Sequence, residues 1–260
     1  MSPKYSQVFL KDRAMCERIA RALGPDGFKR AVEIGPGRGA LTEFLAPLWG
    51  ERLSAVEIDP LLAVRIKEGF PGVRVLNSDF LALDLGTLGE PGSTAFVGNL
   101  PYECSTAILL KVLGSDIFGG AVFMFQLEVA RKIAAPVGGH DYGYLSVAAQ
   151  AQSEISLLSD VPAESFSPVP EVDSSVLSFR PLRRFPEGET RASFLAFVKN
   201  AFSHRRKTLA NSLAFGTGLL KSEVEGRLRD AGFDPRLRPQ NLSVEDYISL
   251  ASMFSRPGRP

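Results

Sequence analysis

The run Asn99-Leu100-Pro101-Tyr102 combines an amide, a stiff backbone and an aromatic ring. An amino group on an aromatic base is a poor nucleophile, because its lone pair is conjugated into the ring. The amide oxygen of Asn99 and the backbone carbonyl of Leu100 or Pro101 could accept both amine hydrogens and aim the lone pair at an electrophilic methyl group. Pro101 stiffens the segment, and Tyr102 can stack on the base. The run therefore predicts methyl transfer to an aromatic amine, unless it is an ordinary turn that ends a strand.

A glycine-rich loop occurs earlier, where residues 33–41 read EIGPGRGAL. Gly35 and Gly37 allow the backbone to turn sharply and to approach a ligand at the start of a helix. With Ala40 they also satisfy a relaxed dinucleotide-binding pattern. Pro36 removes one backbone amide, which suits a pyrophosphate cradle less well. A tight turn without any ligand is the simpler alternative.

Acidic residues follow the next two predicted strands. Glu57, with Ile58 beside it, stands about 20 residues past the glycines, where a carboxylate can accept both hydroxyl hydrogens of a ribose. Asp79 could accept from an adenine amino group, with Phe80 beside the ring, although a plain turn also favours aspartate there. NAD and S-adenosylmethionine both contain that ribose, so these residues leave the choice of cofactor open.

Short apolar runs alternate with helical periodicity up to about residue 180. Strands are predicted at residues 30–34, 53–58, 73–76, 95–98, 121–125, 155–158 and 174–179. Helices are predicted at residues 40–48, 61–68, 105–113, 128–135 and 145–152. This alternation indicates a parallel sheet covered on both faces, with ligands bound beyond the carboxyl ends of its strands.

Beyond a linker at residues 181–188, the pattern is helical only. Helices are predicted at residues 191–202, 206–213, 221–231 and 244–254. Gly232 is placed to cap the third helix, and Ser243 with Asp246 the fourth. We therefore expect an α/β domain over residues 1–183 and a small all-α domain over residues 184–260.

The composition excludes several classes of protein. Apolar residues make up 45% and charged residues 23% of the 260, which indicates a folded chain rather than a disordered one. We find no apolar run long enough for a membrane span and no apolar signal core near the start. Two cysteines and two histidines provide neither a disulfide scaffold nor a zinc site. We expect a cytoplasmic protein without a metal.

The charge is unevenly distributed along the chain. Residues 1–179 have a net charge of −6, and residues 180–260 one of +7. The basic run 204–207 is predicted to open a helix whose first amides also attract phosphate. Arg205, Arg206 and Lys207 are therefore candidate contacts for a nucleic acid, although a solvated helix face is the simpler alternative.

Nine segments, taken in order, are similar to the motifs of one family. They are residues 5–10 (YSQVFL), 33–42 (EIGPGRGALT), 56–60 (VEIDP), 77–81 (NSDFL), 99–102 (NLPY), 125–130 (FQLEVA), 166–174 (FSPVPEVDS), 202–209 (FSHRRKTL) and 242–245 (LSVE). In order and spacing they resemble the KsgA-type ribosomal RNA small-subunit adenine N6-dimethyltransferases. The resemblance covers nearly the whole chain.

The resemblance implies a Rossmann-like methyltransferase sheet that binds S-adenosylmethionine and releases S-adenosylhomocysteine. It implies that the cofactor contacts Gly35 and Gly37, with Glu57 at its ribose. The other implied cofactor contacts are Gln7, Val8, Leu10, Ile58, Asp79, Phe80 and Asn99. Phe166 is implied to face Tyr102 across the target base, which agrees with the need of an unstacked base for two apolar walls.

The implied substrate is a pair of adjacent adenines in a hairpin loop near the 3′ end of 16S rRNA, each methylated twice within a pre-ribosomal 30S particle. We expect a monomer with no membrane partner. The chain departs from the family motifs at Val8, Leu127, Glu171 and His204, where the family has Asn, Lys, Lys and Gln.

Three other functions share part of this pattern. The related large-subunit rRNA methyltransferases share the methyltransferase motifs, but the C-terminal FSHRRKTL argues against them. A catalytically silent assembly factor would not need the intact Asn99 and Tyr102. An NAD dehydrogenase would need an acid or base near the nicotinamide, and the sequence shows none in place.

Overall fold

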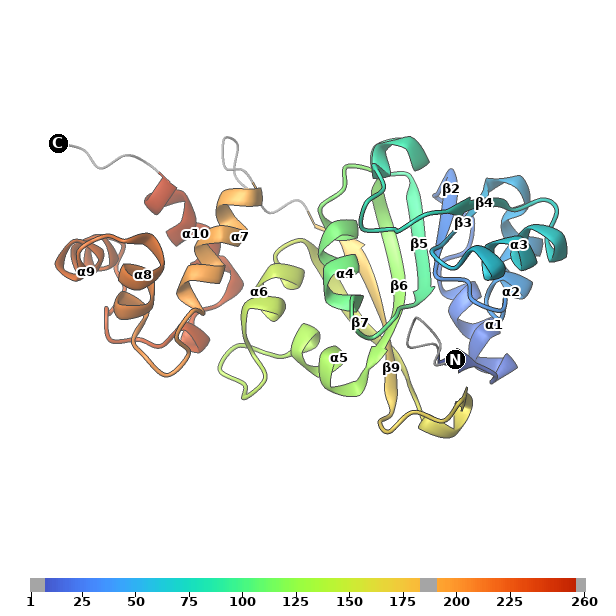
Figure 1. The fold of residues 1–260 in the computed structure, drawn as a ribbon. Coiled ribbons are helices and arrows are strands. Elements are labelled where there is room, and N and C mark those ends of the chain that lie inside the picture. The colour runs from blue at the N-terminus through green and yellow to red at the C-terminus, as the bar shows by residue number, and fades with distance from the viewer. Residues whose placement is uncertain (1–7, 183–190, 256–260) are drawn as a thin grey trace. The chain divides into compact units, whose positions relative to one another are not determined.

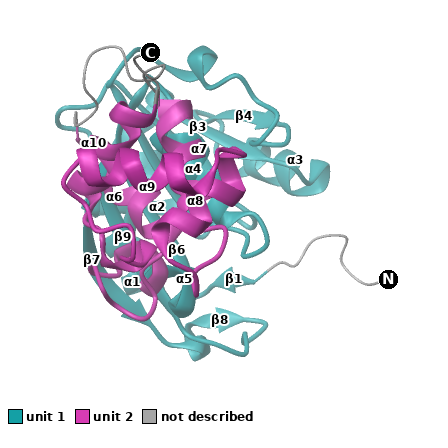
Figure 2. Ribbon diagram, turned by 90° about the vertical axis from the view of Figure 1, so that its left-hand side faces the viewer, with its two compact units in different colours: residues 1–130, 153–181 teal, residues 131–152, 182–260 magenta. Residues whose placement is uncertain are grey.

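The computed structural model describes residues 8–182 and 191–255 (Figure 1). The chain divides into two compact units, which Figure 2 distinguishes by colour. Unit 1 comprises residues 1–130 and 153–181, and unit 2 comprises residues 131–152 and 182–260. Residues 131–152 thus pack with the C-terminal helices, although the predicted boundary placed them in the first domain. The predicted boundary itself, between residues 183 and 184, lies outside the described residues and stays a prediction.

A seven-stranded sheet forms the middle of unit 1, in the order β4-β3-β2-β5-β6-β9-β7. Its strands are β2 (Arg30–Ile34), β3 (Leu53–Glu57), β4 (Arg74–Asn77), β5 (Thr94–Asn99), β6 (Phe118–Gln126), β7 (Ser153–Val161) and β9 (Ser174–Pro181). The ladders joining β4 through to β6 are parallel, whereas β9 runs antiparallel to both of its neighbours. The carboxyl ends of β2, β3 and β5 therefore meet at one edge, as the sequence predicts.

Helices cover this sheet on both faces. Figure 1 shows α1 (Arg13–Ala22), α2 (Thr42–Trp49) and α3 (Pro60–Gly69) on one side, and α4 (Ser105–Leu113) on the other. The first three helices share one apolar cluster with alternate residues of the strands, among them Ala95 and Val97 of β5. This alternation of inward side chains is what a sheet buried on both faces requires.

A second, two-stranded sheet attaches the N-terminal segment to unit 1. β1 (Phe9–Leu10) runs antiparallel to β8 (Phe166–Ser167), with Leu10 opposite Phe166. The Lys11 amide extends the ladder by donating to the Ser165 carbonyl over 2.8 Å. This pairing brings residues 8–10 close to the loops that follow β2 and β5. Neither strand was predicted from the sequence.

Unit 2 is helical. It contains the end of α5 (Leu127–Ala134), then α6 (Tyr144–Gln150), α7 (Arg191–Ala201), α8 (Leu209–Thr217), α9 (Lys221–Asp230) and α10 (Val244–Ser255). Short 3-10 turns occur at Gly50–Arg52, Leu85–Leu88, Ala163–Ser165 and Pro239–Asn241 along the two units. The core of unit 2 is built on buried residues such as Phe194, Leu213, Leu228 and Tyr247. The predicted caps at Gly232, Ser243 and Asp246 are confirmed.

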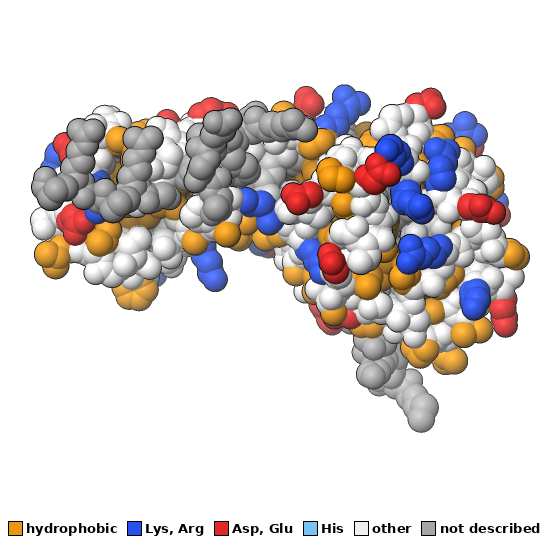
Figure 3. Space-filling view, turned by 90° about the horizontal axis from the view of Figure 1, so that it is seen from above, with side chains coloured by type: hydrophobic (Ala, Val, Ile, Leu, Met, Phe, Trp, Pro, Cys, Tyr) orange, Lys and Arg blue, Asp and Glu red, His pale blue; other side chains and the backbone are white. Residues whose placement is uncertain are grey.

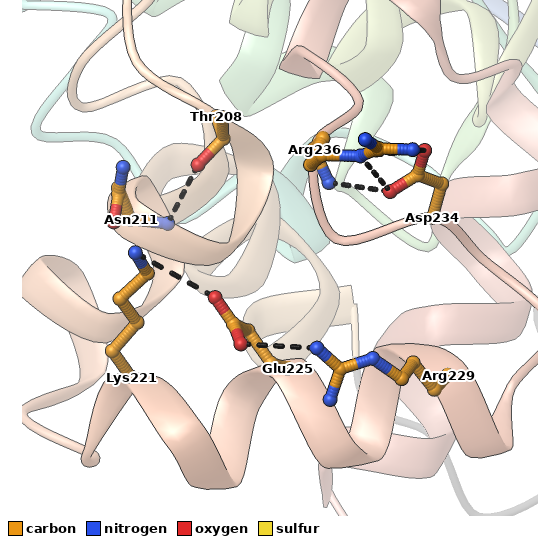
Figure 4. Close-up of polar contacts among 7 residues, drawn as sticks. All are labelled: Thr208, Asn211, Lys221, Glu225, Arg229, Asp234 and Arg236. Carbon is orange, nitrogen blue, oxygen red and sulfur yellow. Dashed lines mark hydrogen bonds and ion pairs between the residues drawn. The ribbon is translucent and has the colours of Figure 1, made fainter.

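One predicted helix start is wrong. The expected helix at 206–213 begins only at Leu209, because the Thr208 hydroxyl caps it by accepting the Asn211 amide, as Figure 4 shows. The basic residues 204–207 therefore lie in the turn before α8 and not in its first turn. Otherwise the α/β fold with a Rossmann-like sheet and a helical C-terminal region is confirmed. No helix of the described residues is long and apolar enough to cross a membrane.

Gly98 in β5 is a position where the fold tolerates no side chain. A Cβ atom there would lie 2.7 Å from the Ile34 carbonyl oxygen, in the backbone of the neighbouring strand. We expect Gly98→Ala to lower the free energy of unfolding by about 1–3 kcal/mol, as overpacking does elsewhere. Urea unfolding measures this. Gly69→Ala, at a position with open space, is the matched control, and an equal effect of both variants would contradict the packing argument.

Candidate functional site

A cavity in unit 1 opens at the carboxyl ends of β2, β3 and β5, beside the N-terminal segment. Its walls contain these predicted residues: Val8, Leu10, Gly35, Gly37, Glu57, Ile58, Asp79, Phe80, Asn99, Leu100, Pro101 and Tyr102. Residues from five separate parts of the chain thus meet in one place. Gln7, also predicted, lies outside the described residues.

The glycine loop has a backbone that only glycine adopts readily. Gly35 and Gly37 have φ angles of 65° and 57°, in the left-handed region. A Cβ atom on Gly37 would also lie 3.0 Å from the ring of Phe9. Phe9 in turn lies under the guanidinium of Arg38, at 4.3 Å from its ring centroid. The N-terminal segment therefore packs directly on the loop.

Glu57 is buried at the end of β3 and faces this loop. One carboxylate oxygen accepts the Gly37 amide over 3.0 Å, and the other accepts the Asp59 amide over 2.9 Å. An ionised carboxylate offers about four lone-pair sites, so each oxygen has one left for a further donor. The arrangement can bind the two hydroxyl groups of a ribose.

Asp79 and Phe80 form the next part of the wall, after β4. Asp79 is exposed, and one of its oxygens accepts the Leu81 amide over 2.8 Å. The Phe80 ring is nearly buried and contacts Phe96 edge to face, with the centroids 6.4 Å apart. A flat heterocycle could therefore rest beside the fixed Phe80 ring, within reach of the remaining Asp79 oxygen.

The Asn99 side chain is oriented by the N-terminal segment. Its amide nitrogen donates to the Val8 backbone carbonyl over 3.2 Å. The amide oxygen of Asn99 is thereby turned away from that contact and remains able to accept. The family has Asn where this chain has Val8. This difference leaves the contact with Asn99 intact, because the contact uses the Val8 backbone rather than its side chain.

The two carbonyls that could act with Asn99 differ in their contacts. The Pro101 carbonyl accepts the Cys104 amide over 3.2 Å, which closes the turn before α4. Within the described residues, the Leu100 carbonyl receives no such bond. Tyr102 is half-buried on the cavity wall, and its hydroxyl lies 3.2 Å from that of Ser174. The Leu100 carbonyl is therefore the freer acceptor, and the Tyr102 ring is held in place.

Phe166 lies in β8, opposite Leu10 of the N-terminal segment. Phe166 is fully buried in the apolar cluster of unit 1, and it is absent from the cavity wall. The reason is the pairing of β8 with β1, which turns the Phe166 ring toward Leu10 and the core. The role of Phe166 as a second wall around a target base stays a prediction.

Glu33, the last acidic residue before the glycine loop, has no role predicted from the sequence. Its side chain is buried in the cavity wall, and one oxygen accepts the Thr42 hydroxyl over 2.7 Å. The other oxygen has no hydrogen-bond partner among the described residues. Burial raises the pKa of Glu33 to about 8, and the nearby Glu57 charge adds to the shift. The signal in the sequence that could have singled out Glu33 is a carboxylate within a strand that is predicted to be buried.

This burial predicts a pH-dependent stability. Because the pKa of Glu33 in the folded chain is raised above its ordinary 4.5, protonated Glu33 favours folding at low pH, and this contribution is lost as the pH rises through about 8. We expect Glu33→Gln to raise the melting temperature of the cofactor-free protein more at pH 9 than at pH 5. Thermal unfolding at both values tests this, and an equal shift at both would contradict it.

The candidate RNA contacts in unit 2, Arg205, Arg206 and Lys207, differ from one another in their surroundings. Arg205 donates to the backbone carbonyls of His140 and Tyr142 over 2.8 and 2.9 Å, so it also holds the 140–142 loop. Arg206 and Lys207 are exposed, and neither forms an ion pair within the described part of the chain. Basic side chains also gather on the face of unit 1 that Figure 3 shows.

No group of three or more His, Cys, Asp or Glu that could hold a metal ion occurs among residues 8–182 and 191–255. The acidic residues Glu57 and Asp79 in the cavity wall favour an uncharged or cationic ligand with a ribose, next to the Asn99 acceptor of amine hydrogens.

Comparison with known proteins bears on this site. The model of the family described as ribosomal RNA adenine dimethylase matches residues 1–255. The chain is 40% identical to the ribosomal RNA small subunit methyltransferase A of Acidobacterium capsulatum, over 95% of this chain and 89% of that protein. It is 42% identical to the protein of the same name from Desulfitobacterium hafniense, over 94% and 88%.

Two solved structures have a similar fold along nearly the whole chain. A dimethyladenosine transferase from Plasmodium falciparum matches with a TM-score of 0.76 at 23% identity, covering 93% of this chain and 95% of that one. The 23S rRNA methyltransferase ErmE matches with a TM-score of 0.68 at 31% identity, covering 95% and 100%.

Proposed function

We propose, from the premise that the chain belongs to the ribosomal RNA adenine dimethylase family, that it methylates adenines of small-subunit rRNA with S-adenosylmethionine as donor. The products are N6,N6-dimethyladenosines at two adjacent adenines in a hairpin loop near the 3′ end of 16S rRNA. The observation that supports this best is that a ribose-binding cradle and the Asn99 amide oxygen share one cavity.

The residues present fit S-adenosylmethionine. Gly35 and Gly37 leave room for the backbone to approach the cofactor, and Glu57 has free lone pairs for its ribose hydroxyls. Asp79 and Phe80 suit its adenine. The unpartnered oxygen of Glu33 adds a buried polar group to the same wall. When bound, the cofactor supplies an electrophilic methyl group on a positively charged sulfur.

Asn99 and the Leu100 carbonyl then act on the substrate amine. They accept its two hydrogens, which draws the nitrogen lone pair out of conjugation and directs it at the methyl carbon. Tyr102 stacks on the target base and keeps it out of the RNA stack. The amine loses its proton only after it has become cationic. A general base with a shifted pKa is therefore not needed.

The choice of rRNA follows from the closer relatives. Relatives at 40–42% identity are named small-subunit enzymes, whereas the large-subunit enzyme ErmE is 31% identical. The large-subunit function remains the second candidate, because ErmE shares the fold along the whole chain. We further propose that the chain acts in the cytoplasm, as a monomer, on a pre-ribosomal 30S particle. The proposed rRNA substrate supports both the pre-ribosomal 30S particle and the cytoplasm as the place of action.

Primer extension tests the proposed function, because dimethylated adenine blocks reverse transcriptase. Immature small subunits and large subunits are incubated with the full chain and S-adenosylmethionine. We expect a new stop near the 3′ end of 16S rRNA and none in 23S rRNA. A stop in 23S rRNA alone would favour the second candidate, and no stop in either would support a silent assembly factor.

A further inference from the structure

A largely exposed aromatic side chain lies near the end of α8. Phe215 is 73% exposed, among the largest exposures of any apolar side chain in the described residues. The His204 ring contacts it edge to face, with the centroids 4.4 Å apart and the planes at 81°. The Ser203 hydroxyl lies 3.2 Å from the Nδ1 atom of His204. The two rings thus form a defined pair on the surface of unit 2.

The backbone beneath this pair is tightly packed. A Cβ atom on Gly216 would lie 2.6 Å from the Cβ atom of Asn200, so the end of α8 rests directly on the end of α7. The Ser203 hydroxyl donates to the Asn200 carbonyl over 2.8 Å. Ordering these rings on binding therefore costs little, because the segments that hold them are already fixed.

Positive charge adjoins the aromatic pair. Arg206 and Lys207 lie in the same turn as His204 and have no ion-pair partner in the described ranges. Two acidic residues of the neighbouring α9 are paired within that helix: Glu225 pairs with Lys221 and Arg229, as Figure 4 shows, and Glu223 pairs with Arg227. Glu223 and Glu225 therefore do not neutralise Arg206 and Lys207.

We propose that Phe215 and His204 form a stacking platform for one unpaired RNA base, while Arg206 and Lys207 contact the phosphates of the same strand. The proposal rests on the proposed function in that the ligand is rRNA. An exposed ring beside free cations matches a polyanion whose bases have π faces. The platform lies outside the methyl-transfer cavity, so it positions RNA and takes no part in the chemistry.

Two RNA probes separate stacking from phosphate contacts. One is a single-stranded oligouridylate of about 12 nucleotides, a length within the usual range for such sites. The other is the abasic ribose-phosphate chain of equal length. Uridine is chosen because it lacks the adenine amine that the cavity recognises. We expect Phe215→Ala in the full chain to weaken oligouridylate binding by about 5- to 150-fold and to leave abasic binding unchanged.

Matched variants complete the test. Phe215→Trp should retain binding, and Leu220→Ala, at a residue 74% exposed, should have no effect. Arg206→Ala and Lys207→Ala should each lower the salt slope by about 0.7 on both probes. The platform would be overturned if Phe215→Ala bound both probes as tightly as the wild type does. It would also be overturned if Phe215→Ala lost the same affinity for both probes. A third contradicting result would be that Phe215→Ala weakens binding only to immature small subunits, which contain protein, because this would indicate a protein partner.

The binding test of the platform and the methylation test of the proposed function can fail independently of each other. Methylation of immature small subunits by the wild-type chain is measured by primer extension in parallel. If methylation occurs but Phe215→Ala binds oligouridylate normally, the platform alone is wrong. If methylation fails, the proposed function is wrong whatever the probes show.

Discussion

Asn99→Ala is expected to lose most methyl transfer while the chain still binds its cofactor. Removing one preorganised acceptor from a developing charge typically lowers turnover by about 10²- to 10³-fold. The glycine loop and Glu57 do not depend on Asn99, so the affinity for S-adenosylhomocysteine should change little. Single-turnover transfer of a labelled methyl group measures the first effect, and titration calorimetry the second.

Asn99→Asp is the informative companion variant. It keeps an acceptor of the same size but cannot donate to the Val8 carbonyl, a bond that spans 3.2 Å in the wild-type chain. We expect turnover between those of the wild type and Asn99→Ala. Equal losses of cofactor binding and turnover in Asn99→Ala would show that this residue supports the structure rather than the reaction.

Glu57→Gln should instead weaken cofactor binding. The new amide group cannot accept from both the Gly37 and the Asp59 amides, and it offers fewer lone pairs to a ribose. Hydrogen bonds to charged groups contribute about 1.5–3 kcal/mol each, so we expect a loss of about 10- to 150-fold in affinity. Calorimetric titration with S-adenosylmethionine and S-adenosylhomocysteine measures it.

Glu43→Gln is the matched control for this variant. Glu43 lies on α2, where it forms an exposed ion pair with Arg13, so its replacement should leave cofactor affinity unchanged. Glu57→Gln with wild-type affinity would remove Glu57 from the ribose site. At saturating cofactor its turnover should approach that of the wild type, because Asn99 is untouched.

Much of the sheet was predictable because its strands are short apolar runs between glycines and prolines. The strand at 30–34 and the helix at 105–113 agree with the structure residue for residue. The positions of Glu57, Asp79 and Asn99 followed from the rule that parallel strands end at one edge. α1 was missed although its signals are present: Asp12 caps it, and the helix buries Cys16 and Ile19 on one face.

Other features depend on contacts between distant residues, which no local pattern reveals. The antiparallel direction of β9 is set by its two neighbours in space. Phe166 is buried because β8 pairs with a segment more than 150 residues earlier in the chain. Arg205 is partly engaged by carbonyls of the 140–142 loop, which its neighbours in sequence could not indicate.

Mass spectrometry of rRNA before and after incubation with the full chain and S-adenosylmethionine tests the central claim most directly. Nuclease fragments of immature small subunits are compared with those of large subunits. We expect two neighbouring dimethylated adenines in a single fragment from the 3′ end of 16S rRNA, and loss of both with Asn99→Ala. Unmodified 16S rRNA, or methylated adenine in 23S rRNA instead, would contradict the account.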